Sequence, residues 1–385
     1  MFARIFALTW IAYCGYYLCR KNFSVLMPYL KTEQGYSSEA LAHVLFVYSV
    51  AYAVGQFGMG QLTDRVGARM VVMGGALVSA GCSTLTGTGF PLVISQGVNG
   101  VAQASGWPGV LKLAREWFPS ANLSVVMAWW GTHLVVGGFL ATNLAASLSA
   151  GDWRRGAWVP SILLGLIGLA FGILARDRQD LIAPHASEIA SVMHGPVPLT
   201  RPLLAIAAMY FCVKLARYSF LFWLPMYMTE QLRYGPVHAG YSSSAFELVG
   251  FGGVLAAGYV SNYFRGSRFR VGAIMMAGLA AMCLAYPFLS HAGPIANLAA
   301  ISLIGALTFG PDVLMAGPGT QEAVPAWATG RAAGFVNGIG SIGQVVSPYL
   351  VALVSTRFGW EALFASLGGA ALLGSAALAT QWRKT

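Results

Sequence analysis

Residues 161–175 read SILLGLIGLAFGILA, a run that contains no charged side chain. A second run of the same kind, ALFASLGGAALLGSAALATQ, occupies residues 362–381 near the end of the chain. A helix of about 20 apolar residues crosses the hydrocarbon core of a bilayer. The strands of a transmembrane β-barrel would instead show short segments of alternating polarity. These runs therefore predict membrane-spanning α-helices.

The composition of the whole chain points to the same class of protein. Of the 385 residues, 57% are hydrophobic and only 9% are charged, with a mean hydropathy of +0.64. A soluble domain carries about 25% charged residues. Charges this sparse do not cover the surface of a soluble protein of this size, whereas lipid removes the need for them.

Hydropathy divides the chain into two sets of six spans. The expected spans are 4–30, 39–62, 70–89, 91–112, 122–147 and 156–176, followed by 203–230, 239–262, 270–290, 295–318, 328–354 and 361–381. A polar stretch rich in proline lies between the sets. We therefore expect an N-terminal six-helix bundle at 1–176, a cytoplasmic linker at 177–201 and a C-terminal six-helix bundle at 202–385.

The distribution of basic residues predicts the orientation of the spans. If the N-terminus is cytoplasmic, the cytoplasmic segments hold fourteen Lys and Arg residues and the outer segments hold five. Cytoplasmic loops carry an excess of Lys and Arg. We therefore expect both termini in the cytoplasm of a cell whose inner (plasma) membrane holds the protein. The net charge of +10 reflects this topology, and no basic patch indicates a nucleic-acid partner.

The two halves repeat each other in sequence. Arg20 is followed eight residues later by Pro28, and Arg217 is followed eight residues later by Pro225. The motif at residues 106–108 (Gly-Trp-Pro) is matched by Gly-Pro at residues 310–311. Parallel repeats of this kind predict a transporter with its binding site at the interface of the halves, near the middle of the membrane.

A few ionisable side chains lie within the expected spans. They are Arg20, Lys21, His133, Lys214, Arg217, Glu247 and Asp312. A charge at the centre of a bilayer costs roughly 2.5–3.5 kcal/mol on insertion scales, so each indicates a function. Without the histidine, the set holds four basic groups and two acidic ones, so pairing within the set does not neutralise it. A bound anion would neutralise the remaining positive charge.

Arg20 and Arg217 are the first candidates to bind that anion, because they occupy equivalent positions in the two halves. The guanidinium group binds phosphate or carboxylate through two parallel hydrogen bonds. Lys214 shares a helical face with Arg217. Glu247 is a candidate counter-charge for Arg217 or Lys214. Asp312 follows a Gly-Pro break, and the sequence leaves its role open between structural pairing and function.

Uncharged and aromatic residues complete the predicted substrate site. Tyr13 and Tyr17 precede Arg20 at helical spacing, so their hydroxyl groups are candidates to line the same cavity. His133 in the fifth span is expected to donate a hydrogen bond when neutral and to add charge when protonated. Trp107 is a weaker candidate. Aromatic packing is the alternative explanation for the tyrosines and the tryptophan.

The loop after the second span carries a recognisable motif. The sequence GQLTDRVGAR at 60–69 resembles the signature loop of the major facilitator superfamily, with Ala68 in place of one basic residue. The resemblance implies that the loop acts as a conformational latch. Its candidate residues are Gly60, Asp64, Arg65, Gly67 and Arg69.

A more specific resemblance covers nearly the whole chain. The stretch YYLCRKNF at 16–23, followed by Met27 and Pro28, is similar to the first-helix motif of the organophosphate:phosphate antiporters. This family includes glycerol-3-phosphate, hexose-phosphate and glucose-6-phosphate transporters. The similarity continues at His133, Arg217 and Glu247. It implies exchange of an organic phosphate for inorganic phosphate by alternating access, with Arg20 and Arg217 on the phosphate group.

Three positions depart from the family pattern. Phe222 stands where glycerol-phosphate members carry an acid that pairs with the lysine matching Lys21, and Lys214 and Asp312 look like additions. The identity of the organic group therefore stays open. A carboxylate or sugar-acid carrier and a sugar-phosphate sensor remain alternatives. We expect no enzyme activity, cofactor or metal site, and a monomer by analogy with other major-facilitator proteins.

Overall fold

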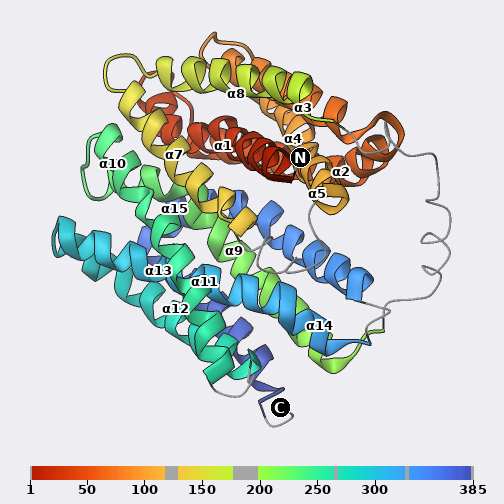
Figure 1. Ribbon diagram of the computed structural model, residues 1–385. Coiled ribbons are helices and arrows are strands. Elements are labelled where there is room, and N and C mark those ends of the chain that lie inside the picture. Colours follow the sequence, from red (N-terminus) through yellow and green to blue (C-terminus); the bar gives the residue numbers. More distant parts are fainter. Residues whose placement is uncertain (1, 118–128, 177–197, 264–267, 326–328, 383–385) are drawn as a thin grey trace. The chain divides into compact units, whose positions relative to one another are not determined.

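The computed structural model describes residues 2–117, 129–176, 198–263, 268–325 and 329–382 of the chain (Figure 1). These residues form helices joined by turns, and none of them lies in a β-strand. In lipid every backbone N–H and C=O group needs an internal partner, and a helix satisfies them within one segment. The all-helical prediction is therefore confirmed.

The chain divides into two compact units. The first comprises residues 1–35 and 43–195, and the second comprises residues 36–42 and 196–385. Most of the predicted linker at 177–201 lies outside the described residues, as does the start of the predicted span at 122–147.

The first unit is organised around its N-terminal helix α1 (Phe2–Thr32). The other described helices are α2 (Ser38–Val66), α3 (Ala68–Leu85), α4 (Leu92–Ala104), α5 (Gly106–Trp117), α7 (His133–Leu148) and α8 (Arg155–Leu174). Helix α1 packs against α3, α5, α7 and α8, and α3 packs against α4, α5 and α8. Side chains on α1 therefore meet groups from most of the unit.

The second unit is built around α9 (Arg201–Glu230) in the same manner. It continues with α10 (Pro236–Ser243), α11 (Ala245–Tyr263), α12 (Arg268–His291), α13 (Pro294–Leu314), the π-helical turn η3 (Met315–Gly319), α14 (Thr320–Ala323) and α15 (Thr329–Ala379). Helix α9 packs against α10, α13 and α15, while α13 also packs against α11 and α12.

Twelve spans follow from these helices. Ten stretches of the described residues are long and apolar enough to cross a membrane. One of them holds two expected spans, because Gly359 in α15 has a non-helical backbone with φ of +87°. The fourth expected span is a succession of two shorter helices, α4 and α5. Pro108 explains the break between them, since proline has no N–H to donate to the preceding turn.

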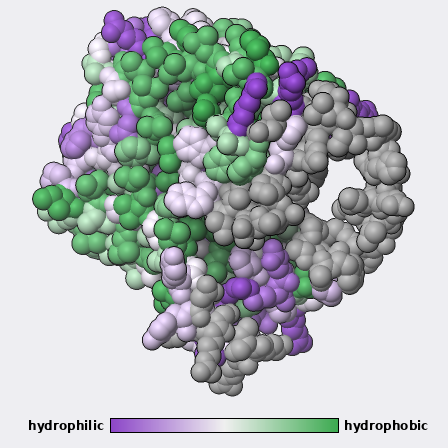
Figure 2. Space-filling view, viewed as in Figure 1, coloured by the Kyte–Doolittle hydropathy of each residue, from purple (hydrophilic) through white to green (hydrophobic). Residues whose placement is uncertain are grey.

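Large apolar side chains are exposed on the helices, as expected for surfaces that face lipid. Ile173 on α8 is 77% exposed, and Ile295 at the start of α13 is 85% exposed. Figure 2 shows that hydrophobic residues dominate much of the described surface in this view. A soluble monomer rarely exposes apolar surface on this scale.

Glycines bring helices into close contact within each unit. A Cβ atom on Gly137 of α7 would lie 3.0 Å from the Cα atom of Cys14 in α1. A Cβ atom on Gly253 of α11 would lie 2.1 Å from the carbonyl oxygen of Ala306 in α13. Such small residues let backbones approach within membranes, where apolar side chains alone provide little attraction between helices.

The predicted latch segment, residues 60–69, comprises the end of α2, a tight turn at Gly67 and the start of α3. Gly67 adopts φ of +96° and ψ of 149°, a conformation open essentially to glycine. The Lys112 ammonium group on α5 donates to the Thr63 carbonyl oxygen at 3.2 Å. Arg65 is exposed, Arg69 is half-buried, Gly60 lies within α2, and the side chain of Asp64 lies outside the described part of the structure.

Candidate functional site

Arg20 lies on α1 among three tyrosine rings and one amide. Its guanidinium carbon is 5.0 Å from the ring centre of Tyr17, 5.1 Å from that of Tyr52 and 5.8 Å from that of Tyr13. Its Nε atom donates to Oε1 of Gln103 on α4 at 3.0 Å. Aromatic faces attract the cation. No acidic side chain of the described residues lies within ion-pair distance of Arg20.

A chain of buried polar side chains holds Gln103 in place. The amide nitrogen of Gln103 donates to the Tyr16 carbonyl oxygen at 3.0 Å and to the Ser79 hydroxyl oxygen at 2.8 Å. That hydroxyl donates in turn to Oδ1 of Asn99 at 2.7 Å, and the Asn99 amide donates to the Cys19 carbonyl oxygen at 3.2 Å. This network joins α1, α3 and α4. Because both N–H groups of the Gln103 amide nitrogen are donated, the amide oxygen is fixed toward Arg20.

His133 begins helix α7 and contacts Tyr13. Their ring centres are 4.7 Å apart, and the ring centre of Trp107 is 5.5 Å from that of Tyr13. The start of α7 is fixed to α1, since the Trp130 indole donates to the Thr9 hydroxyl oxygen at 3.0 Å. The structure therefore brings together the predicted residues Tyr13, Tyr17, Arg20, Trp107 and His133 in the first unit.

Two buried nitrogen atoms of this cluster have no hydrogen-bond partner among the described residues. They are Nη2 of Arg20 and Nε2 of His133. Leaving a buried polar group unsatisfied costs about 1–3 kcal/mol, and more for a charged group. The two atoms therefore mark a place where a ligand with oxygen atoms would be stabilised.

The hydrogen bond of His133 changes the role expected from the sequence. Its Nδ1 atom contacts the carbonyl oxygen of Trp130, and a carbonyl oxygen only accepts, so Nδ1 carries the hydrogen. Neutral His133 consequently presents Nε2 as an acceptor, not as the predicted donor. It accepts from a protonated ligand oxygen, or donates once the ring itself is protonated.

In the second unit, Lys214 and Arg217 lie on one face of α9. The Lys214 ammonium group donates to Oδ1 of Asn337 on α15 at 2.8 Å. Arg217 forms an ion pair with Asp312 on α13, and its guanidinium carbon lies 4.3 Å from the ring centre of Phe309. The structure thus gives Asp312 the part of counter-ion that the sequence left open.

Glu247, the other candidate counter-charge, is buried near the start of α11. The ring of its neighbour Phe246 lies 5.4 Å from that of Phe309, which in turn contacts Arg217. Pairing of Glu247 with Arg217 or Lys214 stays a prediction.

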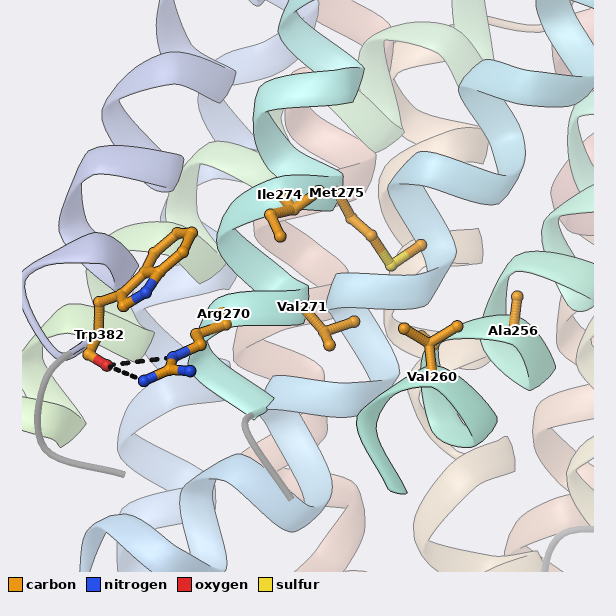
Figure 3. A pocket seen from close by; sticks show the side chains of 8 residues that line it. Ala256, Val260, Arg270, Val271, Ile274, Met275 and Trp382 are labelled. Atoms are coloured by element: carbon orange, nitrogen blue, oxygen red, sulfur yellow. Dashed lines mark hydrogen bonds between the residues drawn. The ribbon is translucent and has the colours of Figure 1, made fainter. Parts of the chain in front are cut away.

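An apolar cavity elsewhere in the second unit contains none of the predicted site residues. It has a volume of about 420 Å³ and lies between α11, α12 and Trp382 (Figure 3). Arg270 is at its edge, where Nε and Nη2 donate to the Trp382 carbonyl oxygen at 3.3 Å. Apart from Arg270 and Trp382, the described residues that line it have small or aliphatic side chains or a methionine side chain.

Sequence reasoning missed Gln103, Asn99 and Tyr52, which surround or support Arg20. A signal for the first two was present, because Gln96, Asn99 and Gln103 recur at spacings of three and four residues in α4. That spacing places uncharged polar side chains on one face of a helix inside the membrane. Tyr52 had no such signal, since only packing brings α2 to Arg20.

The chain belongs to the Major Facilitator Superfamily, whose family model matches residues 9–317. Two solved structures share its fold. One is a bacterial homologue of the human lysosomal transporter Spinster, with a TM-score of 0.75, 12% identity, and coverage of 99% of this chain and 95% of that one. The other is a D-xylose–proton symporter, with a TM-score of 0.75, 14% identity, and coverage of 98% and 97%.

Curated relatives match over most of their length. A glycerol-3-phosphate transporter of Bacillus subtilis (strain 168) is 29% identical, and the match covers 98% of this chain and 92% of the relative. The glucose-6-phosphate exchanger SLC37A2 of Mus musculus is 27% identical, with coverage of 87% and 77%.

Replacing Gln103 by leucine is expected to destabilise the protein. The change leaves Nε of Arg20 without its described acceptor and removes the donor to the Ser79 hydroxyl oxygen, at a cost of about 1–3 kcal/mol. Asn143→Leu is the matched control, because the Asn143 amide donates to the Phe139 carbonyl oxygen of its own helix. Thermal unfolding in detergent should show a larger fall for Gln103→Leu. Equal falls would contradict a supporting role for the network.

Proposed function

We propose that this protein is an antiporter that exchanges an organic phosphate for inorganic phosphate by alternating access. The observation that carries the proposal is Arg20, a buried guanidinium group that has, among the residues the structure describes, no acid beside it and no partner for one nitrogen. The relatives add weight, since their names describe a glycerol-3-phosphate transporter and glucose-6-phosphate exchangers. A sugar phosphate or glycerol phosphate is the corresponding substrate class.

The chemistry of the first unit suits a phosphate group. Arg20 supplies positive charge and a donor nitrogen, and Tyr13, Tyr17 and Trp107 line the same cluster with aromatic faces. His133 offers an acceptor to the P–OH group of a phosphate monoanion, or a donor to a dianion when the ring is protonated. A carboxylate anion has no O–H group, so it cannot donate a hydrogen bond to Nε2 as the phosphate monoanion can.

The second unit contributes Arg217 and Lys214 to the same task. Each unit then supplies one arginine, in keeping with the repeat in the sequence. In the proposed cycle, bound anion neutralises these cations and permits the change between inward- and outward-facing states. The empty protein keeps charge on Arg20 and changes state slowly, so transport in one direction requires an anion for the return.

A loss of exchange is expected when Arg20 is replaced by lysine, although the charge is kept. Lysine cannot hold the Gln103 oxygen and the phosphate in one planar arrangement, so the exchange rate should fall about tenfold or more. The measurement is uptake of labelled inorganic phosphate into proteoliposomes loaded with phosphate. Arg176→Lys is the control, because Arg176 is exposed beyond the end of α8.

The same assay separates the alternatives. Near-normal exchange by Arg20→Lys would contradict the proposed binding geometry. Absence of phosphate exchange by folded wild-type protein, with uptake of sugar acids instead, would identify a carboxylate carrier. Binding of organic phosphates without any transport would identify a sensor.

We further propose a monomer in the inner (plasma) membrane with both termini in the cytoplasm, and a latch at residues 60–69. The basic residues of the sequence support the orientation. Cysteine is introduced at exposed Glu33 or exposed Arg176, and intact cells are treated with a thiol reagent that does not cross the membrane. Labelling of the wild-type protein, which contains five native cysteines, is subtracted as background. Glu33→Cys should then react, and Arg176→Cys should not. The reverse pattern would contradict the orientation.

A further inference from the structure

Arg20 and Arg217 are equivalent in the sequence repeat but differ in their surroundings. Arg217 forms an ion pair with Asp312, whereas no acid of the described residues pairs with Arg20. Both partners of the pair lie in candidate membrane spans. The site in the second unit is therefore partly neutralised by the protein itself.

The two partners of the ion pair differ in exposure. The side chain of Asp312 is 5% exposed and that of Arg217 is 17% exposed, so the guanidinium side chain is the more accessible of the two. Phe309, one helical turn before Asp312 on α13, lies against the guanidinium group at 4.3 Å. An anion that reaches Arg217 therefore competes with Asp312 for the positive charge.

The helix that carries Asp312 is irregular around that residue. Pro311 precedes it and cannot donate a backbone hydrogen bond, and the π-helical turn η3 (Met315–Gly319) follows it, with Pro318 inside. Such π-helical turns within helices often occur at functional sites.

We propose that Asp312 is an internal counter-anion that substrate phosphate displaces from Arg217. In the empty state the carboxylate compensates the buried guanidinium group, and after transport its return favours release of the phosphate. Arg217 is then the group on which the protein carboxylate and the substrate phosphate replace each other. This inference rests on the proposed function and adds a residue that sets the affinity of the site.

The alternative is that the pair is a structural brace between α9 and α13. Removing one partner of a buried ion pair leaves the other charge uncompensated. A brace then gives less folded protein and no gain in affinity. A counter-anion gives tighter phosphate binding, because the competitor of the phosphate is gone.

The test measures phosphate exchange in proteoliposomes as a function of phosphate concentration for Asp312→Asn. We expect the half-saturating phosphate concentration to fall about fivefold or more, which is the lower end of the change in affinity that one ligand usually causes in the binding of another. The maximal rate should also fall, because phosphate is released more slowly. Asp312→Glu keeps the charge and should stay close to wild type. Glu322→Gln is the matched control, since Glu322 pairs with Arg268 and its side chain is 43% exposed.

A half-saturating concentration for Asp312→Asn that equals or exceeds that of Glu322→Gln overturns the inference while leaving the proposed function intact. If wild-type protein exchanges no phosphate, both fail together. Should Asp312→Asn fold poorly, its unfolding temperature is measured against the concentration of inorganic phosphate. The inference predicts a larger rise with phosphate than in wild type, because phosphate replaces the missing counter-anion, and an equal or smaller rise overturns it in favour of a brace.

Discussion

A guanidinium group inside a membrane protein must be compensated, and the arrangement of the first unit follows from this requirement. Arg20 receives an amide oxygen from Gln103 and the faces of three tyrosine rings, but no carboxylate among the described residues. Hydrogen bonds and cation–π contacts hold its position without removing its charge. The protein therefore presents a fixed positive charge in a buried site, the property that selects an anion.

The two units handle the same residue type in different ways. Neutral groups surround Arg20, whereas the carboxylate of Asp312 pairs with Arg217. A carrier must bind its substrate and also release it. Under the proposed function, the charge of Arg20 attracts the phosphate, and the carboxylate of Asp312 limits how tightly Arg217 holds it.

The sequence predicted the twelve spans and the residues on α1 because both depend on local information. Apolar length determines a span, and Arg20 is conspicuous in an apolar helix. The sequence did not predict the helix break before Pro108, and it left the partner of Arg217 open. Asp312 is 95 residues from Arg217 along the chain, so only the packing of α9 against α13 shows that they pair. Gln103 was missed because an uncharged amide attracts no notice until α4 is seen beside Arg20.

The central claim is that the uncompensated charge of Arg20 binds phosphate. The most direct measurement is the unfolding temperature of purified protein against the concentration of inorganic phosphate, for wild type and Arg20→Gln. A ligand that binds the folded state at 100 times its dissociation constant stabilises that state by about 2.7 kcal/mol. The wild-type temperature should rise steadily with phosphate and that of Arg20→Gln should not. An equal rise in both proteins would contradict the account.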